Sequence, residues 1–190
     1  MTPTGTEMNL PAPRTRQQLH TRNVVFKGFR RDDGLWDIEA HLLDFKCKVF
    51  VIPGERSWSP GEPLHDMSIR VTIDDTFVVR NIAVVMAGAP HLECPQAQAP
   101  MKLMIGCTMA AGWRRSIEQN MGKIKGCAHL RELLFNMATV AFQTVSQELD
   151  ESVVDRPPPH VGQCLAWDFS GHAVKRHYPV FYALQKGDNP

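Results

Sequence analysis

The segment KIKGCAHLRELLFNM, residues 123–137, places a thiol and an imidazole two residues apart at the start of a periodic apolar stretch. Cys127 and His129 are residue types that bind zinc or iron, and a helix N-terminus favours a thiolate. In a helix, however, two residues correspond to a rotation of about 200°, so the two side chains share a face only where the first turn is irregular. Cys127 also falls on the apolar positions of the helix, where a cysteine packs as a small hydrophobic residue. The local pattern alone favours this packing role.

Two further segments carry candidate ligands. In LHDM, His65 and Asp66 open a strand directly after a loop, where side chains are both well positioned and accessible. In HLECP, Cys94 stands immediately before a proline at the start of a helical stretch. Taken alone, each is explained better as a surface histidine beside a capping aspartate or as a buried cysteine in a turn. These residues become strong candidates for metal ligands only if folding brings them together.

The segment RRDDGLWDIE contains side chains that could bind a carboxylate substrate. The guanidinium groups of Arg30 and Arg31 can each donate two parallel hydrogen bonds to a carboxylate, and Trp36 offers an apolar surface beside them. The same residues could instead form an arginine–aspartate ion pair and a tryptophan anchor at the entry of a strand. The two interpretations have about equal weight.

Alternating apolar and polar residues predict the strands that must position these groups. From Trp36 the pattern has a period of two, which is typical of a half-buried strand. A cleaner alternation covers residues 67–73, and the apolar segment 77–86 follows after the turn residues Asp74 and Asp75. This order predicts an antiparallel hairpin.

Helical patterns follow the strands. A short helix is expected over residues 96–105, a second after Gly112, and the longest after Gly126, where apolar residues recur every three or four positions. Residues 164–184 predict a terminal hairpin. An antiparallel sheet packed against about three helices is an α+β domain. We expect residues 1–22 to be a flexible N-terminal segment, residues 23–185 to form this single domain, and residues 186–190 to be a flexible tail.

The composition excludes several classes of function. With 21 basic against 20 acidic side chains, the net charge is +1, so neither nucleic acid nor an anionic membrane is expected as a partner. No apolar run reaches the roughly 18–20 residues that span a bilayer, and the first residues lack the apolar core of a secretory signal. Five scattered cysteines without a CxxC pair argue against a disulfide framework. We expect a cytoplasmic protein with a small-molecule substrate, which could form a homo-oligomer.

The order LHDMSIRVTID, DTFVVRNIAVV, ECP and KIKGCAHL resembles the plan of the NifU-type iron–sulfur scaffold domains over about residues 65–142. In that family an aspartate-containing motif opens a strand, and thiols precede later helices. By position, the resemblance implies that Asp66, Cys94 and Cys127 are metal ligands. The chain departs from the family because no cysteine precedes Asp66, so the set of three thiols is incomplete. Mixed oxygen and sulfur ligands fit one zinc or iron ion better than a sulfur-bridged cluster.

Nearly the whole chain resembles an uncharacterised bacterial domain family with the motifs RRxDGLWDIE, HDM and GCxHLxEL. In this sequence the motifs stand as RRDDGLWDIE, HDM and GCAHLREL, in the same order. The resemblance implies a catabolic role directed at aromatic or steroid-like compounds.

We therefore expect a metal-binding protein with one zinc or iron ion, in the form of a metal-dependent lyase or hydrolase. The ion would act as a Lewis acid on a small carboxylate-bearing substrate, an aromatic compound being one candidate. His129 or His65 would be the catalytic acid or base, unless it is itself a ligand. The alternatives are a non-catalytic metal or iron–sulfur scaffold or accessory protein, and a metal-free binding subunit whose cysteines are only buried.

Overall fold

The computed structural model describes residues 10–146, 148, 156–158 and 160–183. The chain divides into two compact units, residues 1–145 and residues 146–190. This division differs from the single domain that the sequence predicts over residues 23–185. Of the expected flexible ends, residues 1–9 and 186–190 lie outside the described residues.

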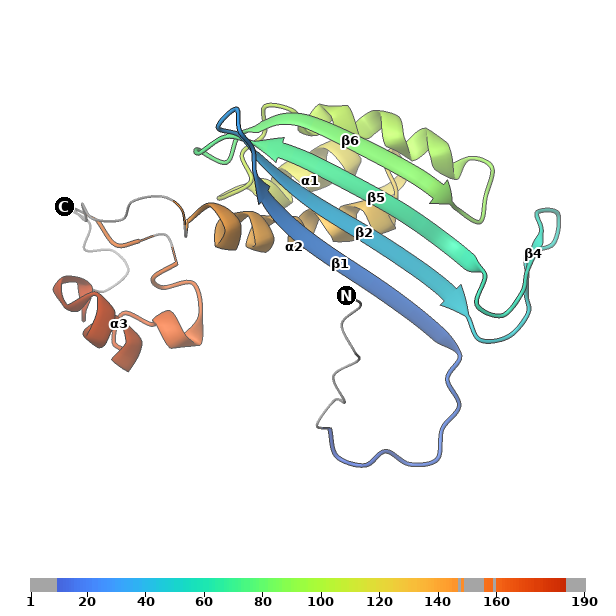
Figure 1. Cartoon of the computed structure of the whole chain (residues 1–190), viewed down its shortest axis with the longest axis horizontal. Helices are drawn as coiled ribbons and strands as arrows, with labels where there is room; N and C mark the ends of the chain where they lie inside the picture. The colour runs from blue at the N-terminus through green and yellow to red at the C-terminus, as the bar shows by residue number, and fades with distance from the viewer. Residues whose placement is uncertain (1–9, 147, 149–155, 159, 184–190) are drawn as a thin grey trace. The chain divides into compact units, whose positions relative to one another are not determined.

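The first unit is built on a four-stranded antiparallel sheet of order β1-β2-β5-β6. Its strands are β1 (His20–Arg30), β2 (Trp36–Lys46), β5 (Pro63–Ile73) and β6 (Val79–Gly88). A two-stranded ribbon, β3 (Phe50–Val51) with β4 (Ser57–Trp58), is inserted between β2 and β5. Apart from this insertion the sheet is a meander, in which strands that follow one another along the chain lie side by side (Figure 1).

The strand predictions are confirmed for β2 and for the β5–β6 hairpin, and the structure contains a further strand, β1. In β2 the apolar positions Trp36, Ile38, Ala40 and Leu42 are all buried. β1 was not predicted, and it begins at His20, inside the segment expected to be flexible. It is an edge strand that is exposed along most of its length, so its sequence lacks the alternation that burial of one face imposes.

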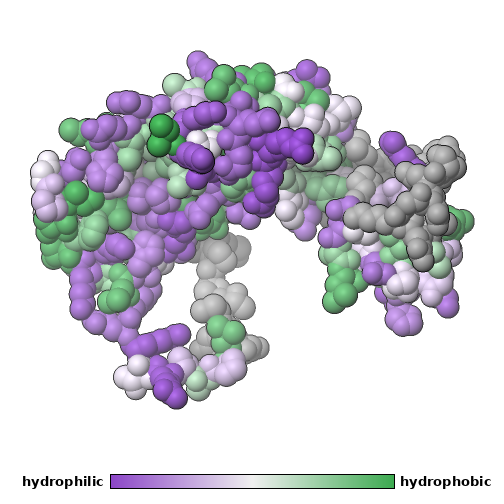
Figure 2. All heavy atoms as spheres, turned by 180° about the vertical axis from the view of Figure 1, so that it is seen from behind, coloured by the Kyte–Doolittle hydropathy of each residue, from purple (hydrophilic) through white to green (hydrophobic). Residues whose placement is uncertain are grey.

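The helices of the first unit pack on one face of the sheet. They are the 3-10 helix η1 (Cys94–Met104), α1 (Trp113–Met121), the single turn η2 (Lys123–Lys125) and α2 (Ala128–Val145). α1 and α2 lie behind the sheet in Figure 1 and share one hydrophobic core with it. Seen from the side of the helices, hydrophilic residues cover much of the surface, with smaller hydrophobic areas between them (Figure 2).

The apolar periodicity of α2 is confirmed, because Leu130, Leu134, Met137 and Ala141 are fully buried. Where α2 crosses β1, the strand carries a glycine. A Cβ atom added to Gly28 would lie 2.7 Å from the Cβ of Thr144, so only a residue without a side chain allows this approach. The glycine therefore sets how closely α2 approaches the edge strand.

The second unit is a small helical assembly. Its elements are η3 (Leu165–Trp167), α3 (His172–His177) and η4 (Pro179–Phe181), packed around Val161, Val174 and Phe181. The predicted terminal hairpin is wrong, because residues 160–183 contain no strand. One cause is local: the Asp168 carboxylate accepts a hydrogen bond from the backbone N–H of Ser170 at 2.7 Å, and such side-chain bonds stabilise turns against strands. Within the described residues, no helix combines the length and the apolar character needed to cross a membrane.

Candidate functional site

The pairing of three neighbouring strands brings Arg22, Asp44 and His65 into one row of the sheet. Asp44 on β2 is the pairing partner of Arg22 on β1 and of His65 on β5. Asp44 follows the buried Leu42 by two positions, and His65 precedes the buried Met67 by two, so both point to the helix side. The pairing of β2 with β5 shifts directly after Asp44. The regular pairing of β2 with β5 therefore ends beside Asp44 and His65.

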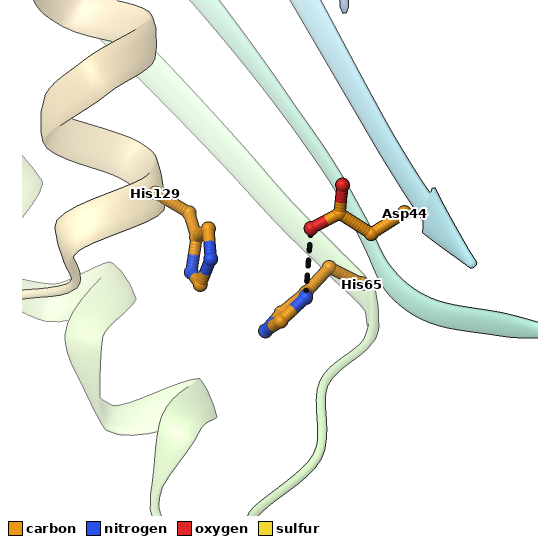
Figure 3. Close-up of side chains that lie close together, drawn as sticks. All are labelled: Asp44, His65 and His129. Atoms are coloured by element: carbon orange, nitrogen blue, oxygen red, sulfur yellow. Dashed lines mark hydrogen bonds and ion pairs between the residues drawn. The ribbon is translucent and has the colours of Figure 1, made fainter. Parts of the chain in front are cut away.

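The first turn of α2 places a second imidazole over this row. The ring centroids of His129 and His65 are 4.0 Å apart. One candidate ligand atom from each of Asp44, His65 and His129 lies within 4.8 Å of the others. Figure 3 shows His129 reaching from the helix toward His65, whose ring also faces the carboxylate of Asp44. We call these three residues the Asp–His–His cluster.

The carboxylate of Asp44 is buried and strongly hydrogen-bonded. Only 1% of the residue is exposed. Arg22 donates from Nε to Oδ1 and from Nη2 to Oδ2, both at 2.8 Å, and the Nδ1 atom of His65 lies 3.1 Å from Oδ2. Burial alone would raise the pKa of the carboxyl, but the hydrogen bonds and charge of Arg22 hold the pKa of Asp44 below its ordinary value. The site therefore contains a carboxylate anion.

Both imidazoles of the cluster are uncharged at neutral pH. Burial lowers the pKa of His65 to about 4, and the neighbouring His129 acts in the same direction against the opposing effect of Asp44. Burial, followed by the charge of Arg22, also lowers the pKa of His129. Neutral imidazole is the form that binds a metal ion or accepts a proton.

Two further residues lie near the cluster, one directly before α2 and one within it. The Sγ atom of Cys127 lies 3.6 Å from Nδ1 of His129. The irregular start of the helix thus permits the thiol and the imidazole to approach one another, although the helical rotation would separate them. One turn further, the Glu132 carboxylate accepts a hydrogen bond from Nη1 of Arg22 at 2.7 Å. Arg22 is therefore held by two carboxylates at once.

The three ligands implied by the NifU-type resemblance do not form such a group among the described residues. Asp66 follows His65 in the strand, so its side chain points to the opposite face of the sheet, where Oδ1 lies 2.8 Å from Nε2 of His41. Cys94 begins η1, and Cys127 lies beside the cluster. The two histidines predicted as acid–base groups are both in the cluster, whereas the carboxylate in it is Asp44.

The residues predicted to bind substrate lie at the other end of the β1–β2 hairpin. Trp36 begins β2 and Asp44 lies near its end, which separates them by roughly 26 Å at about 3.3 Å per residue. Arg31 donates to Asp33 at 2.6 Å, the indole N–H of Trp36 donates to Asp75 at 2.8 Å, and the guanidinium of Arg30 lies 5.6 Å from the Trp36 ring centroid. These contacts match the alternative interpretation, an ion pair and a tryptophan anchor.

Sequence reasoning missed Asp44 and Arg22. A signal for Asp44 was present, because it continues the buried positions of the predicted strand two residues beyond Leu42. A carboxylate at a core-facing position needs partners, and this marks it as unusual. No comparable signal exists for Arg22, since its strand was itself not predicted.

The fold and the cluster define an α+β protein with a polar site between a sheet and a helix N-terminus. Residues 20–143 match the family described as "protein of unknown function (DUF2889)", and the chain belongs to this family. The match begins at the first residue of β1 and ends in the last turn of α2, so it contains the whole cluster but not the second unit. An uncharacterised family was expected over nearly the full length. No curated protein and no solved structure matches the chain.

Proposed function

We propose that the Asp–His–His cluster binds one zinc or iron ion and that the protein is a metal-dependent enzyme. The observation that carries the proposal is the convergence of one carboxylate and two imidazoles, from β2, β5 and α2, within 4.8 Å. Two histidines and one carboxylate are a ligand set used by catalytic zinc sites and by non-haem iron(II) sites. Such sites keep coordination positions open for water or substrate.

The protonation states support metal binding in preference to a purely structural role. A buried anion beside two neutral imidazoles offers ligand groups that need not lose a proton before binding. The hydrogen bond between Asp44 and Nδ1 of His65 leaves Nε2 of His65 as the atom with a free lone pair. Among the described residues, none is found hydrogen-bonded to that Nε2 atom. Asp44 can therefore act as a ligand or can orient His65 as a ligand.

The reaction class follows from the chemistry of such an ion. A Lewis acid polarises a carbonyl group or lowers the pKa of a bound water, which serves hydrolysis and lyase reactions. We keep a small carboxylate-bearing catabolic compound as the proposed substrate, an aromatic one being a candidate. An imidazole that is not a ligand would be the acid or base. All five cysteines are free thiols, which supports the proposal of a cytoplasmic location.

A metal-free enzyme is the second candidate, and one contact favours it. The Asp44–His65 hydrogen bond of 3.1 Å is the arrangement by which a carboxylate orients a catalytic histidine. A NifU-type iron–sulfur scaffold is a third proposal, but the cluster contains no thiolate, and iron–sulfur clusters are held mainly by cysteines.

Elemental analysis of the untagged protein tests the proposal. We expect about one zinc or iron per chain, lost in His65→Ala and in His129→Ala. His91→Ala is the matched control, because His91 also lies beside a carboxylate, with Nδ1 3.2 Å from Glu55, but on the exposed surface. Acid-labile sulfide would indicate the scaffold instead. A protein that holds no metal as purified, and takes up neither Zn²⁺ nor Fe²⁺ in calorimetric titration, would leave the metal-free enzyme.

A further inference from the structure

The outer face of the four-stranded sheet carries a hollow that is separate from the Asp–His–His cluster. The helices of the first unit pack on the other face, where the cluster lies, and none of the helices described in this unit covers the outer one (Figure 1). The hollow has a volume of about 470 Å³. This value falls within the range of about 300–1,000 Å³ that is usual for small-molecule sites.

Two adjacent rows of outward-pointing residues form the hollow, with one residue from each strand in each row. The first row consists of Lys27, Glu39, Arg70 and Ala83. The second row consists of Val25, His41, Ser68 and Val85. Neighbouring strands lie about 4.8 Å apart, so each row is roughly 14 Å long. The short side chains of Ser68 and Ala83 lie among longer ones, which makes the surface concave.

Lys27 is the cation of the hollow whose charge is not already paired. Arg70 donates to Oε1 of Glu39 at 2.7 Å, and the imidazole of His41 lies 2.8 Å from the carboxylate of Asp66. No ion pair of the Lys27 ammonium is found in the part of the chain that the structure describes. An anionic group bound in the hollow would therefore meet Lys27 without displacing an existing partner.

The hollow also exposes aliphatic side chains. Val25 beside Lys27 is 49% exposed, and Val85 on the opposite edge strand is 59% exposed. Ala83 adds a third small apolar side chain between the polar ones. A ligand that lies across the strands would bury these groups with an apolar body while its charged end stays at β1.

We propose that this outer hollow binds a small monoanionic carboxylate with an apolar body. The carboxylate binds at Lys27, whose ammonium group donates hydrogen bonds to it. Glu39 lies next to Lys27 in the same row and repels a dianion, so a monoanion is favoured over a phosphate. The site lies on the opposite face of the sheet from the cluster and does not depend on a bound metal.

Nuclear magnetic resonance titration of the full ¹⁵N-labelled chain tests the proposal with 3-phenylpropanoate as the probe. We expect saturable shifts of backbone amides in the two rows at millimolar concentrations, with the amides of His65 and His129 unchanged. 3-Phenylpropanol lacks the charge and propanoate lacks most of the apolar body, so both should bind at least tenfold more weakly.

Two substitutions locate the charged end and the apolar end of the probe. Lys27→Met keeps the length of the side chain but removes the charge, and should weaken binding about tenfold, which corresponds to about 1.4 kcal/mol. Val85→Ser should also weaken it. Lys48→Met is the matched control, because Lys48 is an exposed lysine outside the hollow, and should leave binding unchanged.

Three results would overturn the proposal. They are the absence of saturable shifts with the probe, equal affinity of the Lys27→Met variant, and shifts centred on the cluster instead of the outer rows. The last result would place the carboxylate at the proposed metal centre. Loss of metal from the protein, by contrast, would leave the titration unaffected, so the two proposals fail independently.

Discussion

At the residue scale, the unusual group is the buried anion of Asp44. Desolvation of a carboxylate costs several kcal/mol, and the two hydrogen bonds from Arg22 offset this cost. Only Asp44 is fully buried, since the side chain of Arg22 is 32% exposed, and replacing even a fully buried ion pair with apolar residues is often neutral or stabilising. Stability is therefore a weak explanation for the pair. The position of Asp44 beside two neutral imidazoles is better explained by the proposed chemistry, in which its fixed negative charge binds a metal ion or orients His65.

Cys127 is predicted to position His129 without being a metal ligand. Its Sγ atom lies 3.6 Å from Nδ1 of His129, but Cys127 is not part of the group whose ligand atoms are mutually within 4.8 Å. We expect Cys127→Ser to retain the metal with affinity reduced by about 10–100-fold, as for other residues that orient a ligand. The cobalt-substituted protein should lack a thiolate-to-metal charge-transfer band in its absorption spectrum. A cobalt protein with that band would make the thiol a ligand.

The imidazole of His65 makes the stability of the metal-free protein depend on pH. Its pKa is about 4 in the folded state, against about 6.5 for a histidine in an unfolded chain. Between these values the unfolded chain binds a proton that the folded chain does not. The free energy of unfolding should therefore fall as the pH falls from about 6.5 to about 4, by up to about 1.4 kcal/mol per pH unit from this group.

Urea unfolding of chelator-treated protein at several pH values measures this dependence. His129 contributes in the same direction, since its pKa is also lowered. His65→Asn removes one titrating group and should flatten the curve between about pH 6.5 and pH 4. An equally steep curve in this variant would show that His65 takes up its proton without cost in the folded state.

At the element scale, the contact between β1 and α2 holds the two sides of the site together. Arg22 comes from the edge strand, and Glu132 and His129 come from the helix. The strand and the helix meet again further along, where Gly28 faces Thr144. The spacing of the two elements is therefore set at one end by a glycine and at the other by charged hydrogen bonds.

Gly28→Ala is expected to destabilise the protein by about 1–3 kcal/mol, as overpacking in a core does. The new Cβ atom would lie 2.7 Å from the Cβ of Thr144, so helix or strand must shift. Thermal unfolding measures the loss. A second substitution, Thr144→Ala, removes the outer atoms of the threonine and should restore part of the lost stability. If the Gly28→Ala variant were as stable as the parent, the helix would adjust to the added methyl group without cost. Asn23→Ala, on the same exposed strand, serves as the control.

At the scale of the whole molecule, the family domain and the first unit coincide. The family match covers residues 20–143, and the first unit ends at Val145. All residues of the candidate site, from Arg22 to Glu132, belong to this unit. The second unit has only three buried hydrophobic residues in its core among those described. Such a small core stabilises a chain only weakly.

A chain that ends at Val145 is therefore expected to fold and to keep the site. Its unfolding should remain one cooperative transition, and its affinity for the metal should change by no more than about twofold. Calorimetry and metal titration of the shortened and the full chain measure both. Loss of cooperative unfolding, or of metal binding, would mean that residues 146–190 are needed by the first unit. A substitution that disturbs only the second core, Val174→Ala, should leave the site unchanged.

Local pattern determined much of the architecture. The period of two in β2 and β5, the turn at Asp74, and the repeat of three and four in α2 are each properties of a short stretch of sequence, so the α+β class could be predicted. The edge strand β1 could not, because it is exposed along most of its length and its sequence therefore lacks a regular alternation of apolar and polar residues. The terminal hairpin was predicted wrongly, because two short apolar runs fit a helical assembly as well as a ribbon.

Only the tertiary structure decided which polar groups meet. His65 and Asp66 are neighbours in sequence, yet the strand sends them to opposite faces of the sheet. Asp44 and His65 are 21 residues apart and come within 3.1 Å, because the pairing of β2 with β5 aligns them. Strand register and helix placement are set by long-range packing, whereas residue type and periodicity are local. The sequence alone therefore determined most elements of the first unit and named both histidines, and folding selected Asp44 as their carboxylate partner.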